Sequence, residues 1–306
     1  MRVAVFGATG VQGAHQVSLL TEAGHTVTAI SRTAQPLKLH NNKTITTTAA
    51  DISDPPALST ALQNIDTIFV NLPSTSFAQS GPILTGTANI ATAAKQQNIS
   101  HIIFNTSMPV PEIPQDIKAQ DDRREMRRIL RETGIPVISI QPVCYIDNLL
   151  EGWALPPIRD TNTLVYCHKP HLRVSWICHH DVAQLMVAAM LRPELGNRNF
   201  PVGGAETVVL SQLAEKLSRA WGRELGCVNQ TVADFCDKIS ASMEGRGLES
   251  QQIVKDMFKA YTYYNEAEDE PFNIDMKGVL ESLPVRLTPI EEWAKRPGRQ
   301  PENVHF

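Results

Sequence analysis

The chain lacks a long apolar run and an excess of charge of either sign. No segment reaches the roughly 20 consecutive apolar residues that a membrane-spanning helix needs. The first residues form a short strand and lack the longer apolar stretch and small-residue cleavage site of a signal peptide. The net charge of −4 argues against broad electrostatic binding to nucleic acid or anionic lipid. We therefore expect neither a membrane nor a nucleic acid as a partner.

Cysteines are few, odd in number and widely scattered, at positions 144, 167, 178, 227 and 236. This favours reduced thiols and a cytoplasmic protein. Residues 167–171 and 178–181 are rich in cysteine and histidine, but neither segment has a standard Cys-x2-Cys or His-x3-His spacing, so no metal is predicted. The Gly-x-Ser-x-Gly motif of a serine hydrolase is also missing.

The first half of the chain alternates short apolar or β-branched runs with helical patterns. Strands are predicted at 3–6, 26–31, 44–48, 67–70, 101–104 and 137–140, and helices at 10–23, 55–62, 82–97 and 121–132. A loop is expected at 33–42. Regular alternation of this kind predicts the α/β class, with a doubly wound parallel sheet and right-handed crossovers.

The alternation fails after Pro142. We predict one domain over residues 1–150. Residues 151–306 then form mostly a smaller substrate or cap domain, with part of about 178–210 returning to the first domain. Later helices are expected at 181–191, 211–221, 232–243 and 250–264, with short strands within 164–177 and at 200–202. The segment 245–247 is a candidate hinge or loop.

A glycine-rich turn joins the first strand to the first helix. In the run 7–13, Gly7 permits the tight turn, Gly10 lets backbone approach a pyrophosphate, and Gly13 lets helix and strand pack closely. The helix N-terminus offers free N–H groups and a positive dipole end to the anion. The turn also contains Thr9, Val11 and Gln12. This context predicts a Rossmann-type dinucleotide site.

The end of the second strand indicates which dinucleotide binds. NAD-binding domains usually carry Asp or Glu there, whereas this chain has Ser31 and Arg32. Arg32 can pair with a 2′-phosphate, and Lys38 can add a second positive charge, so NADP(H) is the expected cofactor. The alternative is that Arg32 is an ordinary exposed strand-end residue.

Further cofactor contacts are expected where the third and fourth strands end. Asp51 and Ile52 should lie near the adenine, and Asn71, Leu72 and Pro73 near the ribose and nicotinamide. The reason is that ligands of open α/β sheets bind at the carboxyl ends of the strands.

Taken together, these residues resemble the NmrA-like family of atypical short-chain dehydrogenase/reductases. The resemblance also includes Asn105, Thr106 and Ser107, and the segments 127–136, 141–142, 180–183 and 287–293. It implies a Rossmann domain that prefers NADP(H), a small C-terminal substrate domain, and Asn105 and Thr106 beside the cofactor. The family includes reductases of quinones and plant phenolics, fungal secondary-metabolism enzymes, and redox sensors without demonstrated catalysis.

The catalytic Tyr-x-x-x-Lys dyad of standard short-chain dehydrogenases is absent, since no tyrosine is followed four residues later by lysine. Phenolic reductases instead carry a lysine ahead of an Arg-Arg pair, and alignment on Arg127 and Arg128 places Arg123 there. Arginine is a poor general acid near neutrality, although it can bind an anionic oxygen. Lys118 is an alternative. The arginine-rich helix can also be a solvated face with internal ion pairs.

Two other side chains can supply the acid. Ser107 ends the fifth strand, where related enzymes place a hydroxyl near the substrate carbonyl, but it can also bond its own loop. Tyr145 follows the sixth strand and is either a proton donor or a buried pocket wall. We therefore predict an NADPH-dependent oxidoreductase, monomeric or homodimeric, that passes hydride to a small, fairly apolar, electron-poor metabolite. The alternatives are an NADP(H)-sensing regulatory protein and a non-reductive cyclase or isomerase.

Overall fold

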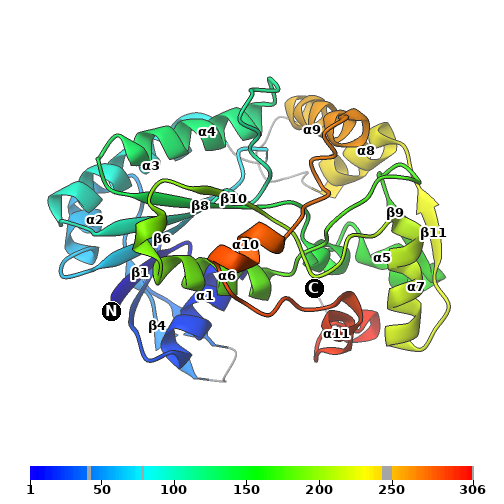
Figure 1. The fold of residues 1–306 in the computed structure, drawn as a ribbon, viewed down its shortest axis with the longest axis horizontal. Helices are drawn as coiled ribbons and strands as arrows, with labels where there is room; N and C mark the ends of the chain where they lie inside the picture. Colours follow the sequence, from blue (N-terminus) through cyan, green and yellow to red (C-terminus); the bar gives the residue numbers. More distant parts are fainter. Residues whose placement is uncertain (40–42, 77–78, 243–249, 305–306) are drawn as a thin grey trace. The chain divides into compact units, whose positions relative to one another are not determined.

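A seven-stranded parallel sheet organises the first part of the computed structural model, which describes residues 1–39, 43–76, 79–242 and 250–304 (Figure 1). The strand order is β10-β8-β7-β6-β1-β2-β5. The strands are β1 (Arg2–Phe6), β2 (Thr26–Ser31), β5 (Thr48–Ala49), β6 (Thr67–Asn71), β7 (His101–Asn105), β8 (Val137–Pro142) and β10 (Asn199–Val202). The chain builds outward from β1 to β5 and then returns to β1 on its other side. The predicted doubly wound parallel sheet is confirmed, with its switch point between β1 and β6.

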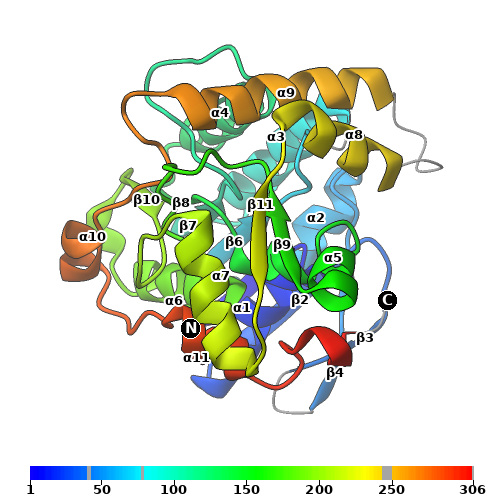
Figure 2. The ribbon, with the colours of Figure 1, turned by 90° about the vertical axis from the view of Figure 1, so that its right-hand side faces the viewer.

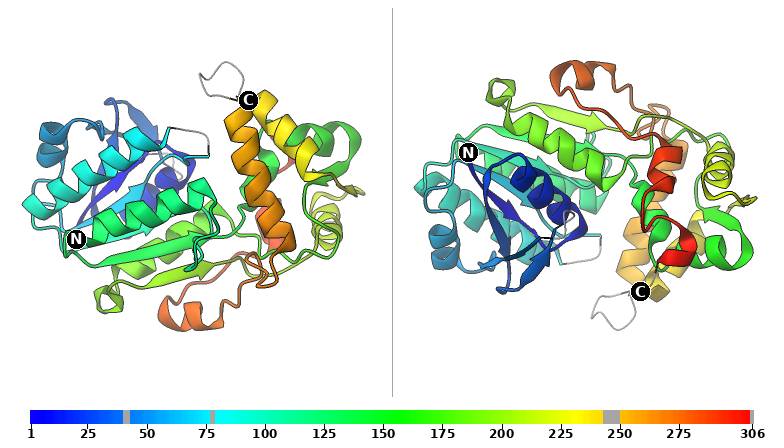
Figure 3. Two further views of the ribbon diagram at one scale, coloured as in Figure 1. Left: turned by 90° about the horizontal axis from the view of Figure 1, so that it is seen from above. Right: turned by 90° about the horizontal axis from the view of Figure 1, so that it is seen from below.

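Helices cover both faces of this sheet. The helices α2 (Pro55–Ala61), α3 (Ser80–Gln96) and α4 (Lys118–Arg131) lie on one face, and α1 (Val11–Glu22) and α6 (His179–Met190) lie on the other (Figures 1 and 3). Because both faces are covered, the central strands are apolar at successive positions rather than at alternate ones. Residues 3–6 of β1, for example, are at most 1% exposed.

In the first half of the chain, the prediction of a single strand at 44–48 is wrong. Residues 44–48 do not form one strand: β4 (Thr44–Thr46) pairs antiparallel with β3 (Pro36–Lys38), outside the main sheet, and only β5 joins β2. Thr47 separates them. Its hydroxyl lies 2.7 Å from that of Ser31 and accepts a hydrogen bond from the Gln35 backbone N–H. The expected loop at 33–42 therefore contains a strand, because these side-chain contacts redirect the backbone.

The second unit has its own small sheet, in which β9 (Thr163–Tyr166) pairs in parallel with β11 (Gly226–Asn229). Figure 2 shows these two strands side by side with α5 (Leu155–Thr161) and α7 (Leu210–Trp221) beside them. The helices α8 (Val232–Ser242) and α9 (Ser250–Glu266) pack as a pair, and α11 (Ile290–Lys295) contacts α7. An aromatic cluster that includes Trp153, Tyr166 and Phe235 lies in this unit.

The division of the chain differs from the predicted one in two places. The first unit contains residues 1–142, 179–202 and 277–285, and the second contains 143–178, 203–276 and 286–306. The first segment of the first unit thus ends at Pro142 rather than near residue 150. The first unit also takes back α10 (Lys277–Ser282), which the periodicity did not indicate. The predicted hinge or loop at 245–247 lies outside the described residues.

All five cysteines are free thiols. In the part of the chain that the structure describes, no helix is both long enough and apolar enough to cross a membrane.

The contact between α1 and the turn before it gives a direct test of the fold. A Cβ at Gly13 would lie 2.2 Å from the backbone oxygen of Gly7, and neither backbone can yield easily. We expect Gly13→Ala to lower the free energy of unfolding by about 2 kcal/mol or more, the upper part of the overpacking range. Urea denaturation measures this.

The matched control is Gly81→Ala in α3, where an added Cβ meets nothing within 4 Å. Alanine favours a helix over glycine, so this variant should be neutral or more stable by up to about 1 kcal/mol. Equal stabilities of the two variants would contradict the close helix–strand contact.

Candidate functional site

A cavity of about 560 Å³ lies where β1, β2, β5, β6 and β7 end. The residues that line it all belong to the first unit. They are Phe6, Gly7, Thr9, Gly10, Val11, Gln12, Gly13, Ile30, Ser31, Arg32, Ala50, Asp51, Ile52, Asn71, Leu72, Pro73, Ile83, Asn105 and Ser107. Two residues predicted to lie near the cofactor, Lys38 and Thr106, are missing from this lining; Lys38 is exposed at the end of β3 (Pro36–Lys38). The structure therefore brings the ends of five strands, which are separate in the sequence, together at one edge of the sheet.

The glycine-rich turn forms one wall. Gly7 has a φ of +66°, and a Cβ there would lie 2.5 Å from the Asn71 backbone oxygen, so the fold itself requires glycine at this position. Gly10 is different, since its added Cβ would approach only the Gly7 oxygen, at 3.3 Å. The fold alone does not strictly demand a glycine at position 10, whereas close approach of a ligand to the backbone would.

The N-terminus of α1 borders this turn. Gly10 is the N-cap and offers no side chain to the first helical N–H groups, and the first turn of α1 contains no acidic residue. The unpaired N–H groups and the helix dipole therefore give this end of the cavity a positive potential that no neighbouring carboxylate in the turn cancels. An anion is the ligand that this arrangement favours.

The ends of β2 and β5 carry the charged residues of the cavity. Arg32 is exposed and makes no hydrogen bond or ion pair with the described residues. The Asp51 carboxylate accepts hydrogen bonds from the Ser53 hydroxyl at 2.6 Å and the Ser53 N–H at 2.8 Å. These bonds, and then the charge of Arg32, hold the pKa of Asp51 below its ordinary value. Asp51 is thus a carboxylate already engaged by Ser53, while the guanidinium of Arg32 remains available.

Ser31 has a supporting position. Its hydroxyl donates to the Thr33 backbone oxygen and lies 2.7 Å from the Thr47 hydroxyl. These contacts fasten the loop that follows β2, so Ser31 orients the segment that carries Arg32.

A network of side-chain amides borders the cavity with Asn71 at its centre, and sequence reasoning missed one of its members, Gln16. The Asn71 amide donates to the Gln16 side chain at 2.7 Å and to the Phe6 backbone oxygen at 3.0 Å. It accepts from Gln16 at 3.0 Å and from Asn105 at 3.3 Å. Gln16 is completely buried. The network ties α1, β1, β6 and β7 together at the switch point. The available signal was the pair Gln12 and Gln16, which lie one helical turn apart on the same face of α1.

Gln12 lines the cavity from the same face of α1. Its side-chain nitrogen donates to the His179 backbone oxygen at 3.1 Å, at the start of α6. Its side-chain oxygen is buried and has no hydrogen-bond partner among the described residues.

Ser107 is the predicted catalytic residue that the structure places on the cavity wall. It has a φ of +61°, an uncommon conformation for a serine, and its N–H donates to the Asn105 side-chain oxygen at 2.8 Å. Its hydroxyl has no hydrogen-bond partner in the described part of the chain. A strained backbone that turns a polar group toward a cavity is a frequent feature of functional sites.

Arg123 was predicted to reach the substrate, and the structure contradicts this. The side chain is completely buried, and Nη2 donates to the backbone oxygens of Leu72 and Pro73, each at 3.0 Å. It therefore supports, from behind, the loop that lines the cavity. The long side chain reaches from α4 to the loop after β6. The local sequence does not show that this loop packs against α4, so the contact could not be predicted.

Lys118 and Thr106 also lie off the cavity. Lys118 is the first residue of α4 rather than a loop residue, and its ammonium binds Asp122 at 2.9 Å and the Ser80 hydroxyl. Thr106 is fully buried and its hydroxyl donates to the Met108 backbone oxygen at 2.7 Å. Both side chains are engaged in holding neighbouring segments.

Tyr145 belongs to the second unit. It is half-buried and precedes a short 3₁₀ helix (Ile146–Leu150), and it forms a bridge with Ile177. Its role as an acid stays a prediction.

The two cysteine- and histidine-rich segments do not assemble a metal site in the described part of the chain, where no three His, Cys, Asp or Glu side chains are grouped to hold an ion. The helix α6 begins at His179, two residues before its predicted start, so Asp181 lies inside the first helical turn.

The comparisons with known proteins agree with this architecture. The family model described as the NmrA-like family matches residues 1–294, which confirms the resemblance read from the sequence. An NAD(P)H azoreductase of Xenophilus azovorans is 28% identical over 247 residues, covering 80% of this chain and 82% of that protein.

Two solved structures share the fold at lower identity. The NADPH-dependent quinone oxidoreductase of Escherichia coli complexed with NADPH has a TM-score of 0.71 and 21% identity, covering 95% of this chain and 98% of that one. NmrA, a negative transcriptional regulator in complex with NAD, has a TM-score of 0.72 and 18% identity, covering 97% of this chain and 94% of that one.

The buried position of Arg123 generates a stability prediction. Arg123→Met removes the donors of two loop carbonyls, and each unsatisfied group costs about 1–3 kcal/mol. We expect the free energy of unfolding to fall by about 2–4 kcal/mol in chemical denaturation. Arg128→Met is the control, because its side chain is 54% exposed and its ion pairs should be worth less than about 1 kcal/mol. A similar loss in both variants would argue against the supporting role of Arg123.

Proposed function

Because the chain belongs to the NmrA-like family, we propose that it is an NADPH-dependent reductase that transfers hydride to a small, fairly apolar, electron-poor substrate such as a quinone, enone or imine. The observation that carries this proposal is the cavity at the switch point of the sheet. It combines the glycine-rich turn, the available guanidinium of Arg32 and the hydroxyl of Ser107.

The cofactor residues proposed here follow the walls of that cavity. The turn from Gly7 to Gly13 would hold the pyrophosphate, since Gly10 leaves space and the start of α1 supplies N–H donors. Ile52 would flank the adenine, and Asn71, Leu72, Pro73 and Asn105 the ribose and nicotinamide. Bound NADPH would supply the hydride.

The preference for NADPH rests on the charges at the ends of β2 and β5. Arg32 has no competing partner among the described residues, and a planar guanidinium can bind a 2′-phosphate through two parallel hydrogen bonds. Asp51 is the acidic residue of the described lining, and its carboxylate accepts hydrogen bonds from Ser53. Because these bonds lower its pKa, Asp51 keeps its negative charge, and the proposed preference for NADPH therefore rests on the attraction of Arg32.

The residues of the cavity can position a substrate but offer little acid. Among the described residues that line it there is neither tyrosine nor lysine. Ser107 would donate a hydrogen bond to the oxygen on which negative charge develops, and Arg123 would act indirectly by holding Leu72 and Pro73. A positioned acid typically raises the rate 10²–10⁴-fold, so its absence slows the reduction of an ordinary carbonyl. A substrate that accepts hydride readily needs less help from an acid and is slowed least. This is why an electron-poor substrate is proposed.

The relatives support this class of reaction. An azo compound and a quinone are both electron-poor acceptors, and these are the substrates in the names of the azoreductase and the quinone oxidoreductase. Both names describe reduction by a nicotinamide cofactor.

A second candidate function is sensing of the NADP(H) redox state without turnover. It is favoured by the same lack of tyrosine and lysine in the described cavity lining, and by the fold shared with the regulator NmrA. A sensor should bind the cofactor but leave NADPH unconsumed in the presence of quinones, azo compounds and imines.

The cofactor preference can be measured directly. Calorimetric titration should show tighter binding of NADPH than of NADH, and Arg32→Ala should remove most of the difference. Loss of a hydrogen bond to a charged group costs about 1.5–3 kcal/mol, or roughly 10- to 150-fold in affinity. Lys95→Ala, which removes an exposed charge on α3 away from the cavity, is the matched control and should keep the preference. Equal affinity of the wild type for both cofactors would refute the assignment.

The role of Ser107 is tested by turnover with a quinone acceptor. Ser107→Ala should lower kcat by about tenfold or more at unchanged NADPH affinity, since it removes one donor to a developing negative charge. Ser100→Ala, at the opposite end of β7, is the control and should leave kcat unchanged. If the wild type consumes NADPH and Ser107→Ala is fully active, the proton and the oxyanion contact come from elsewhere.

A further inference from the structure

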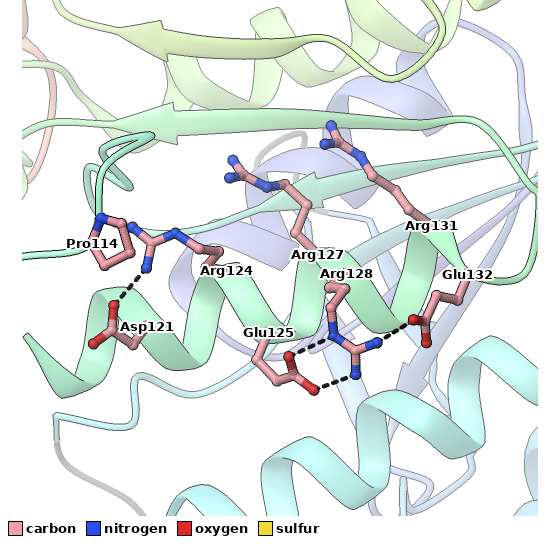
Figure 4. A pocket seen from close by; sticks show the side chains of 8 residues that line it. All are labelled: Pro114, Asp121, Arg124, Glu125, Arg127, Arg128, Arg131 and Glu132. Carbon is pink, nitrogen blue, oxygen red and sulfur yellow. Dashed lines mark hydrogen bonds and ion pairs between the residues drawn. The ribbon is translucent and has the colours of Figure 1, made fainter. Parts of the chain in front are cut away.

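A second cavity, of about 640 Å³, lies along α4 and shares no residue with the first. Figure 4 shows Arg124, Arg127 and Arg131 extending in one direction from the helix, while Arg128 extends in another. Spacings of three and four residues place side chains on one helix face, so the row follows from the sequence of α4. The other residues of the lining are Pro114, Asp121, Glu125 and Glu132.

The carboxylates of this cavity are already paired. Asp121 binds Arg124 at 2.5 Å. Glu125 binds Arg128 at 2.6 Å, and Glu132 binds the same guanidinium. Within the described part of the chain, neither Arg127 nor Arg131 has a carboxylate at ion-pair distance. Two positive charges in the row therefore lack a direct counter-ion.

Arg127 is the more unusual of the two. Its side chain is only 5% exposed, and Nη1 is buried without a hydrogen-bond partner among the described residues. Nε of Arg124 and Nε of Arg131 are also buried without partners there. Burial, together with the charges of Arg131 and Arg124, lowers the pKa of Arg127 from its ordinary value, whereas the charge of Glu112 raises it.

Glu112 does not complete the site. It is exposed, and its carboxylate accepts a hydrogen bond from the Asn199 side chain at 2.9 Å. Arg131 donates to the backbone oxygen of Asn197 at 2.6 Å and to the Asn199 side-chain oxygen at 2.8 Å, which are neutral groups. These contacts orient Arg131 without neutralising it.

We propose that the row of Arg124, Arg127 and Arg131 is an anion site that takes a phosphate dianion. A buried guanidinium without a partner is unfavourable in a folded chain unless a ligand supplies the missing acceptors. A phosphate carries close to two negative charges and three strong acceptor oxygens, which match two unneutralised guanidiniums and several unpaired N–H donors. A monocarboxylate has half this charge and fewer acceptor positions. The site is independent of the proposed reductase activity.

The probe is inorganic phosphate, titrated into the full chain by calorimetry in a phosphate- and sulfate-free buffer of low ionic strength. We expect saturable binding that Arg127→Met weakens at least about tenfold, because it removes charged hydrogen bonds. Lys95→Ala is the control for loss of a positive charge, because Lys95 is exposed, does not line this cavity, and its removal leaves Glu125 and Glu132 paired with Arg128, so binding should be unchanged. Arg32→Ala should also retain binding, which separates this site from the cofactor cavity.

Thermal denaturation measures the effect of Arg127 and of phosphate on the stability of the fold, in addition to the binding affinity. Without phosphate, Arg127→Met should unfold at a temperature no lower than the wild type, because it replaces an unpaired buried charge by an apolar side chain. Phosphate should raise the Tm of the wild type and not that of the variant. If Arg127→Met does not fold, Arg127→Lys keeps the charge and should still bind several-fold more weakly, since lysine lacks the planar fork.

Titrations with two other anions, phenyl phosphate and acetate, identify the class of ligand. Tighter binding of phenyl phosphate than of inorganic phosphate would assign the site to phosphate monoesters, and equal or weaker binding would assign it to the free ion. Absence of saturable phosphate binding, equal binding by Arg127→Met and the wild type, or acetate binding as tight as phosphate would overturn the proposal.

Discussion

The backbone contact between the glycine-rich turn and the start of α1 is the constraint on which the rest of the molecule depends. Because Gly13 carries no side chain, α1 begins directly against Gly7 at the end of β1. This contact aims the first turn of the helix at the edge of the sheet. The cavity exists because β2, β5, β6 and β7 end at that same edge, as parallel strands with right-handed crossovers must.

Buried polar side chains give that edge its definite shape. The amides of Gln16, Asn71 and Asn105 satisfy one another and join a helix to strands that are far apart in the sequence. Arg123 does the same for the loop after β6. Since an unsatisfied buried group is costly, each network permits few alternative arrangements of the segments it holds. These networks thereby preorganise the walls of the cavity. Asn71 and Asn105 line it themselves, whereas Gln16 and Arg123 support it without lining it.

The helix α4 has two separate roles that follow from the direction of its side chains. Arg123 lies toward the apolar side of the helix and stabilises the candidate reductase site from behind. Arg124, Arg127 and Arg131 form a row that borders another cavity (Figure 4). The expectation of a solvated, ion-paired helix face is right for the exposed Arg128, which binds Glu125 and Glu132. It holds for the ion pair of Arg124 with Asp121, but not for Arg131, which has neutral partners, or for the buried Arg123 and Arg127.

The sequence by itself determined the parallel α/β architecture, the family and the glycine-rich turn, because apolar periodicity and glycine spacing act through short-range backbone geometry. It also identified Arg32, Asn71 and Ser107 as residues of one site, since residues at the carboxyl ends of parallel strands must meet at one edge of the sheet. Only the tertiary structure decided how residues 44–48 divide between two sheets, that 277–285 returns to the first unit, and what Arg123 and Arg127 contact. The partner of a long polar side chain depends on which distant element packs against it, and no local pattern records that.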